Sequence, residues 1–193
     1  MSLLNLQKND ILDLTKKDPS LNNIVLAAGW DVVKKGIFSF STADMDLDLS
    51  AFLLNENGKI IGEDGLIYFG QRRGKGIFLH GDNRTGAGDG DDEKISITLN
   101  NLPYNCSKVV FCVNIYQGKE RRQDFSKVKN AYVRVLNSDK GDTEICRYNL
   151  SEDGQNATSL IFAELEKIGS DWNFKAVGQL EQGDLKSLIN KYN

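Results

Sequence analysis

The chain has 193 residues, is 40% hydrophobic and 26% charged, and carries a formal net charge of −3. These values are ordinary for a globular protein, and the length suggests one domain spanning residues 1–193. They exclude a fibrous chain, and no apolar run approaches the roughly 18 residues that a membrane-spanning helix requires. The N-terminal segment lacks the basic, apolar and small-residue regions of an export signal, so we expect a cytoplasmic protein.

Alternation of apolar and polar side chains with a period of two is the main pattern along the chain. It predicts strands, which in chain order cover residues 22–32, 74–81, 93–99, 108–116, 131–137, 143–150 and 159–168. The segment 159–179 is typical of a hairpin that turns at Gly169-Ser170-Asp171. A short helical turn is expected within 125–131, and Asp184 is placed to begin a C-terminal helix. The sequence therefore predicts an all-β protein, a two-sheet antiparallel β-sandwich with a few short helices, including a C-terminal helix.

Negative charge is concentrated in two segments. Residues 82–93 contain five carboxylates and one arginine, and residues 44–48 contain three aspartates. Because the whole chain carries only −3, the remainder is net positive. This distribution points to a local cause for the acidity and away from a generally acidic surface. It also gives no basic face for nucleic acid, so we expect no nucleic-acid partner.

The first acidic segment, GDNRTGAGDGDDE (81–93), lies between two expected strands and is rich in glycine. Its carboxylate, amide, hydroxyl and backbone carbonyl oxygens are the ligands that Ca²⁺ prefers, and no cysteine lies within it. The spacing does not match an EF-hand, because Lys94 stands where glycine is required and Asn100 where glutamate is required. The candidate side-chain ligands here are Asp82, Asn83, Thr85, Asp89, Asp91, Asp92 and Glu93.

The second acidic segment is ADMDLDLSAFLL, in which Asp44, Asp46 and Asp48 alternate with apolar residues. On a strand these three carboxylates share one face and repel one another. A cation held between this strand and the 81–93 loop would relieve both clusters. The alternative is a solvated acidic edge beside a flexible glycine loop.

The chain resembles the TerD family of bacterial tellurium-resistance and general stress proteins. The resemblance rests on the loop pattern GDN-x-TG-x-G-x-GDDE, on AAGWDV (27–32) and on DMDLDLSAFLL. In the C-terminal half, NAYVRVLN, RYNLSEDG, LIFAELEK and WNFKAVGQ are similar to family segments. The similarity runs from about Leu6 to Gln179, and AAGW departs from the family's more usual GLGW.

The resemblance implies a β-sandwich that binds two calcium ions near the acidic loop. By position, the side-chain ligands are Asp31, Asp46, Asp48, Asp82, Asn83, Asp91, Asp92 and Glu93. Backbone carbonyls around Arg84, Gly88 and Gly90 add to them, and Asp44, Thr85 and Asp89 are further candidates. The implied function is a non-enzymatic sensing or scaffolding module in stress response, acting with other resistance proteins, some of them membrane-associated. No small-molecule substrate is implied.

Two other functions stay open at this stage. A calcium-dependent module that binds a membrane surface would use basic loop tips, for which Arg72, Arg73, Lys75 and Arg84 are available. A metal-dependent hydrolase would need an open coordination position and a general base, and the chain has a single histidine, His80. We interpret His80 as an ordinary residue at a strand end.

The three cysteines, Cys106, Cys112 and Cys146, have irregular spacing and are interpreted as structural.

Overall fold

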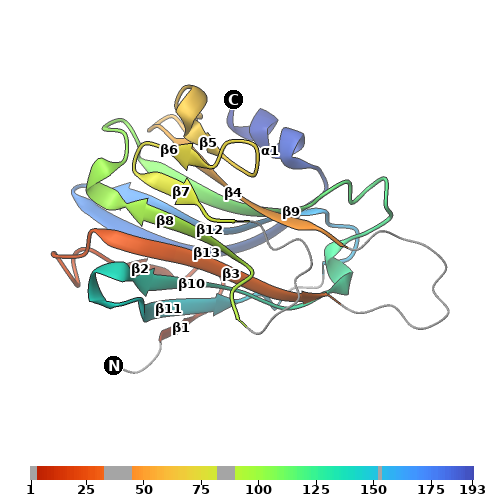
Figure 1. The fold of residues 1–193 in the computed structure, drawn as a ribbon, viewed down its shortest axis with the longest axis horizontal. Helices are drawn as coiled ribbons and strands as arrows, with labels where there is room; N and C mark the ends of the chain where they lie inside the picture. The colour runs from red at the N-terminus through yellow and green to blue at the C-terminus, as the bar shows by residue number, and fades with distance from the viewer. Residues whose placement is uncertain (1–3, 33–44, 82–89, 152–153) are drawn as a thin grey trace.

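Two β-sheets make up the computed structural model, which describes residues 4–32, 45–81, 90–151 and 154–193 (Figure 1). Among these residues, the order in the seven-stranded sheet is β1-β11-β10-β3-β8-β7-β6, and in the six-stranded sheet β2-β13-β12-β9-β4-β5. The first sheet comprises β1 (Leu4–Leu6), β3 (Asn23–Val32), β6 (Arg73–Gly74), β7 (Ile77–Leu79), β8 (Glu93–Thr98), β10 (Val128–Asn137) and β11 (Thr143–Asn149). The second comprises β2 (Ile11–Asp13), β4 (Leu47–Leu54), β5 (Leu66–Ile67), β9 (Lys108–Ile115), β12 (Ser159–Ile168) and β13 (Asp171–Glu181).

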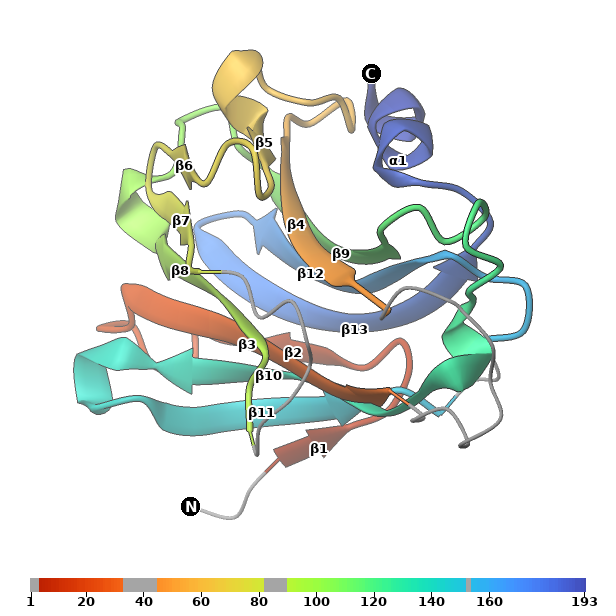
Figure 2. The ribbon, with the colours of Figure 1, turned by 45° about the vertical axis from the view of Figure 1, so that its right-hand side comes forward.

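The main core lies between the two sheets, which face each other in Figure 2. Strand β8 shows how alternation builds this core, because Ile95 and Ile97 are buried while Lys94 and Ser96 are half-buried on the other face. Strand β4 contributes Leu47, Leu49, Ala51 and Leu53 to this core, and its opposite face is buried as well. The predicted β-sandwich is therefore confirmed, since each sheet removes one apolar face from water.

The longest strand pairing joins β12 and β13, the hairpin that the sequence predicted at residues 169–171. Gly169 has φ of 64°, a left-handed conformation that glycine adopts without strain. The strand expected at 22–32 is confirmed as β3, which lies at the centre of its sheet. The structure differs from expectation in the N-terminal segment, which adds β1 and β2, and β1 pairs in parallel with β11.

A second apolar cluster lies on the outer face of the six-stranded sheet. Helix α1 (Leu185–Tyr192) covers this face, and Leu188 packs there against Phe52, Val110, Cys112 and Ile161 (Figure 2). The Asp184 side chain accepts a hydrogen bond from the Ser187 amide, and the Ser187 hydroxyl oxygen accepts one from the backbone N–H of Asp184. This capping box confirms the predicted helix start.

Four single-turn 3-10 helices complete the described secondary structure, at Glu63–Gly65, Leu99–Asn101, Phe125–Lys127 and Ser138–Lys140. The turn expected within 125–131 is one of them. The three cysteines are buried with free thiols, in agreement with their interpretation as structural residues. In the part of the chain that the structure describes, no helix combines the length and the apolar character that crossing a membrane requires.

Candidate metal centre

The two acidic segments meet where β4 of one sheet begins beside β8 of the other. Oε2 of Glu93 accepts a hydrogen bond of 2.8 Å from the backbone N–H of Leu49, although the two residues are 44 positions apart. Both residues are buried, and each directly follows an aspartate of its own acidic segment, Asp92 and Asp48. The sequence placed these segments side by side only by hypothesis. The hydrogen bond shows that they are neighbours in space.

Asp92 ties the start of β8 to the end of β3. Its Oδ2 accepts a hydrogen bond of 2.8 Å from the backbone N–H of Trp30, and its own N–H donates to the carbonyl of Ala28 at 2.8 Å. Asp92 is only 8% exposed. Trp30 is buried in the main core, so the position of Asp92 is fixed by both the backbone and the core.

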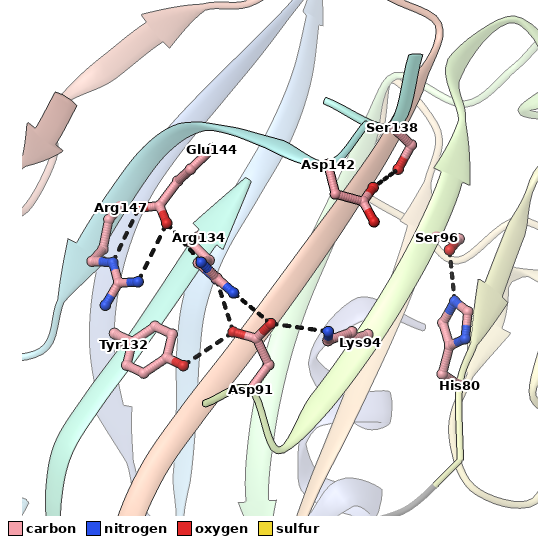
Figure 3. Close-up of polar contacts among 10 residues, drawn as sticks. All are labelled: His80, Asp91, Lys94, Ser96, Tyr132, Arg134, Ser138, Asp142, Glu144 and Arg147. Atoms are coloured by element: carbon pink, nitrogen blue, oxygen red, sulfur yellow. Dashed lines mark hydrogen bonds and ion pairs between the residues drawn. The ribbon is translucent and has the colours of Figure 1, made fainter. Parts of the chain in front are cut away.

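Asp91 contacts Tyr132 and Arg134 on the outer face of the seven-stranded sheet (Figure 3). Its two oxygens accept bonds of 2.8 Å from Nε and Nη2 of Arg134, a bidentate ion pair. The hydroxyl of Tyr132 donates to Oδ1 at 3.0 Å, and Nζ of Lys94 lies 3.1 Å from Oδ2. The Asp91 side chain is 2% exposed. In this arrangement Asp91 is engaged by protein cations, and its predicted role as a metal ligand stays a prediction.

These contacts change the acidity of the groups concerned. Burial raises the pKa of Asp91, but the hydrogen bonds from Arg134, Lys94 and Tyr132 outweigh it, and the net pKa lies below its ordinary value. Burial, reinforced by the Asp91 charge, raises the pKa of Tyr132 to about 12. The bond to Asp91 raises the pKa of Arg134 above its usual range. All three groups therefore keep their usual protonation at neutral pH.

Asp46 and Asp48 stand at the start of β4. The carbonyl of Asp46 accepts a hydrogen bond of 2.8 Å from the N–H of Tyr116, which extends the pairing of β4 with β9. Asp48 is 7% exposed and lies directly opposite Asn114 of β9. Both point away from the main core, because their strand neighbours Leu47, Leu49 and Val113 belong to it. The sequence placed Asp46 within the strand, but β4 begins at Leu47, one residue after it.

Asn114 is a candidate ligand that sequence reasoning missed. It is 4% exposed, and its Oδ1 has no hydrogen-bond partner in the described part of the chain. Residues directly opposite on antiparallel strands have Cβ atoms about 4.5–5.5 Å apart, so the Asn114 and Asp48 side chains are neighbours on the same face of the sheet. The only sequence signal was an asparagine inside the apolar run VVFCVNIY.

Asp31 lies at the end of β3 and is exposed. Its Oδ2 accepts a hydrogen bond of 2.7 Å from the side-chain amide of Asn130. Gly90 is exposed and has φ of 121°, which favours glycine. The other predicted ligands lie outside the described residues: Asp44, Asp82, Asn83, Arg84, Thr85, Gly88 and Asp89.

The described candidate ligands offer carboxylate and amide oxygens and no sulfur, and these are the atom types that a hard cation such as Ca²⁺ prefers. Within residues 4–32, 45–81, 90–151 and 154–193, however, no three His, Cys, Asp or Glu side chains converge closely enough to hold an ion. His80 contacts Ser96 at 2.6 Å and is exposed at the end of β7, which confirms its interpretation as a strand-end residue.

Comparison with known proteins identifies the family. A family model described as the TerD domain matches residues 1–192. The chain belongs to the TerD family. It is 40% identical over 191 residues to the tellurium resistance protein TerD of Serratia marcescens, covering 98% of this chain and 96% of that protein. It is 38% identical to general stress protein 16U of Bacillus subtilis, with the same coverage.

The fold agrees with a solved structure of the family. A homologue of the telluride resistance protein TerD from Streptomyces coelicolor A3(2) superposes with a TM-score of 0.69 at 21% identity, over 88% of this chain and 96% of that one. The chain is thus a member of a tellurium-resistance and stress-response family, a group named for resistance and stress response and not for an enzymatic reaction.

Proposed function

We propose that this TerD-family protein is a calcium-binding, non-enzymatic module of the stress response, which acts as a sensing or scaffolding component. The observation that carries the proposal is the hydrogen bond of 2.8 Å between Leu49 and Glu93, which joins the two acidic segments. Asp48 and Asp92 each precede one residue of this bond and each carry a carboxylate at a buried position, for which a divalent cation is a natural counter-charge.

Both sheets would contribute calcium ligands. Asp46, Asp48 and Asn114 would offer oxygens from the six-stranded sheet, and Asp92, Glu93 and Asp31 from the other sheet. Calcium would supply positive charge where β4 begins beside β8. Occupancy would then fix the relation of β4 to β8 and give partner proteins a surface to recognise. We place these partners among other stress and tellurium-resistance proteins, some at the inner face of the membrane, and this protein in the cytoplasm.

Calorimetric titration of the metal-free chain with Ca²⁺ tests the proposal. We expect saturable binding with two ions, and a melting temperature that falls in EDTA and returns with Ca²⁺. Asp48→Asn combined with Asp92→Asn should abolish binding while keeping side-chain volume. Asp142→Asn is the control, because this exposed aspartate accepts a bond of 2.6 Å from Ser138 and lies outside both acidic segments. If titration of the wild-type chain with millimolar Ca²⁺ gave no heat of binding, the proposal would be refuted.

A calcium-dependent membrane-surface function is the second candidate. The hairpin of β6 and β7 leads into the acidic loop, and Arg72, Arg73 and Lys75 on it are exposed. Phe69, which precedes this hairpin, is 47% exposed. Co-sedimentation with anionic vesicles separates the candidates. Binding that requires Ca²⁺ and is lost in Arg72→Gln with Lys75→Gln would favour the membrane function.

A further inference from the structure

A pocket opens at one end of the outer face of the seven-stranded sheet, where β3, β10 and β11 lie together. Its volume is about 470 Å³, and its lining includes Trp30, Asp31, Asn130, Tyr132, Arg147 and Asn149. This volume falls within the roughly 300–1,000 Å³ of small-molecule sites. None of the functions discussed above uses the pocket as a whole.

The pocket is shaped by a β-bulge. The register of β10 against β3 shifts between Lys129 and Tyr132, and Asn130 within the bulge has φ of 52°. Asparagine tolerates this left-handed conformation better than most residues. The bulge turns the Asn130 amide to Asp31, to which it donates at 2.7 Å. Bulges often re-aim side chains beside functional sites.

Tyr132 forms the aromatic part of the pocket. A Cβ atom at Gly29 would lie 2.5 Å from the Tyr132 ring, so glycine at this position is what allows the ring to cross β3. The guanidinium carbon of Arg147 lies 4.3 Å from the ring centroid. Stacking on an aromatic ring and pairing with a carboxylate hold an arginine in one orientation, which prepares it for a ligand.

A row of alternating charges ends at this arginine. It runs from Lys94 to Asp91, Arg134, Glu144 and Arg147, with contacts of 3.1, 2.8, 2.8 and 3.1 Å (Figure 3). The row contains three cations and two anions, so its net charge is +1. Arg147 is the member of the row that lines the pocket. Its Nε and Nη2 each donate to Glu144, at 3.1 and 3.3 Å. A guanidinium has five N–H donors, so three of them have no partner among the described residues and can serve a ligand.

We infer that this pocket binds a small polyhydroxylated anion, a sugar acid or sugar phosphate. The oxyanion would pair with Arg147, whose planar donors match carboxylate and phosphate oxygens. Hydroxyl groups would donate to the exposed Asp31 carboxylate and exchange hydrogen bonds with the Asn130 and Asn149 amides. A second acidic group is disfavoured, because it would meet Asp31.

Calorimetry with gluconate and with glucose 6-phosphate tests the inference and separates the two sources of the oxyanion. We expect at least one of them to bind saturably. Sorbitol, which lacks the charge, and hexanoate, which lacks the hydroxyls, should bind at least about tenfold more weakly, the effect of losing one charge-assisted contact or several hydrogen bonds. No saturable binding of either anion, or equal binding of hexanoate, would overturn the inference.

Variants locate the binding. Arg147→Gln should weaken the bound anion at least about tenfold, because the ion pair is lost. Glu144 keeps Arg134 at 2.8 Å in this variant, so the fold should persist, which the melting temperature checks. Arg121→Gln is the matched control, because Arg121 also stacks on a tyrosine, Tyr116 at 5.1 Å, outside the pocket. Asn149→Ala should also weaken binding, and equal affinity in all variants would place the ligand elsewhere.

Asp31 is left unchanged in these tests because it is a candidate calcium ligand. The affinity difference between wild type and Arg147→Gln should persist in EDTA, since no contact named here needs a metal. Its disappearance in EDTA would contradict this assignment. Failure to bind gluconate and glucose 6-phosphate leaves the calcium proposal intact, because that proposal is measured by Ca²⁺ titration.

Discussion

The side chain of Glu93 accepts a hydrogen bond from the backbone N–H of Leu49, with Oε2 and the amide nitrogen 2.8 Å apart. The bond connects the first residue of β8 to β4, which belongs to the other sheet. Strand β5 pairs with β4 only at Ala51 and Phe52, so Leu49 lies beyond the reach of that neighbour. The carboxylate therefore satisfies a buried amide that the sheet does not, and it fixes one acidic segment against the other.

We predict that Glu93→Ala lowers the free energy of unfolding by about 1–3 kcal/mol, the cost of leaving a buried N–H without an acceptor. Glu93→Gln keeps an acceptor oxygen and should lose less. Urea denaturation at neutral pH measures both. The control is Glu166→Ala, whose carboxylate is 38% exposed and 3.4 Å from Lys108, and which should cost less than about 1 kcal/mol. Equal losses in Glu93→Ala and Glu166→Ala would contradict the structural role of Glu93.

Acid should weaken the charged row on the outer face. Although burial raises the pKa of Asp91 and Glu144, their arginine contacts dominate and leave both below the ordinary values of 3.8 and 4.5. A carboxyl whose folded pKa is depressed stabilises the fold above its ordinary pKa, and this contribution is lost as the pH falls through the folded value. We predict stability that is steady above about pH 5 and falls progressively below it.

Arg134→Leu identifies the source of that acid sensitivity. Without the guanidinium, Asp91 and Glu144 lose the partner that depresses their pKa, so the slope of stability against pH below pH 5 should flatten. At pH 7 the variant should be about 1–3 kcal/mol less stable, because the Asp91 charge, 2% exposed, loses its bidentate partner. Urea midpoints at a series of pH values give the slope. An unchanged slope would assign the acid sensitivity to other carboxyls.

The strands were predictable because one face of each is buried, which imposes a period of two on the sequence. Segment 93–99 and the hairpin over 159–179 show this plainly, and both are present. Strands β1 and β2 have three residues each, too few for alternation to be seen. Their formation depends on pairing with distant strands, β11 and β13.

The candidate site was predictable in composition but less so in arrangement. The sequence shows Asp91, Asp92 and Glu93 as one acidic run, yet they contact Arg134, Trp30 and Leu49 in turn. Asp91 and Arg134 are 43 residues apart, and no local spacing signals their contact. Tertiary pairing brings Arg134 to β8 across β3, which only the strand order reveals.

Gly178 should be intolerant of any side chain. Its φ is 60°, and an added Cβ would lie 2.0 Å from the hydroxyl of Tyr148, which is buried. We predict that Gly178→Ala costs about 2–4 kcal/mol, from backbone strain and overpacking together. Gly141→Ala is the control, because its φ is 64° and nothing lies within 4 Å, so only the backbone term of about 1 kcal/mol remains.

Removing the tyrosine hydroxyl separates the two contributions. In Gly178→Ala with Tyr148→Phe, the closest contact becomes the ring carbon at 3.0 Å, so part of the overpacking is relieved. The double variant should therefore be more stable than the sum of the single changes predicts, by about 1 kcal/mol in a double-mutant cycle. If the losses of unfolding free energy in the two single variants simply add up in the double variant, the Tyr148 hydroxyl is not what excludes a side chain at position 178.

The cysteines should be unreactive in the folded protein. Burial raises the pKa of Cys106 to about 11 and that of Cys146 to about 12, and Cys112 is raised further by the same cause. Since the thiolate is the reactive form, a thiol reagent at pH 8 should modify the native chain very slowly. Three equivalents should react once guanidinium unfolds the protein. Rapid native modification of one thiol would identify a site that opens.

Asn114 gives the sharpest test of the calcium proposal, because its buried amide oxygen has no hydrogen-bond partner among the described residues and the residue lies opposite Asp48. If that oxygen binds the ion, Asn114→Leu should weaken calcium at least about tenfold, while the metal-free protein loses little or gains stability from the apolar side chain. Asn137→Leu is the control, because this asparagine is also buried with an unpartnered Oδ1 but lies on β10 opposite Ile24. Calcium titration and urea denaturation of both variants decide the matter. Equal calcium affinity in Asn114→Leu and wild type would remove Asn114 from the ligand set and leave the carboxylates to be tested alone.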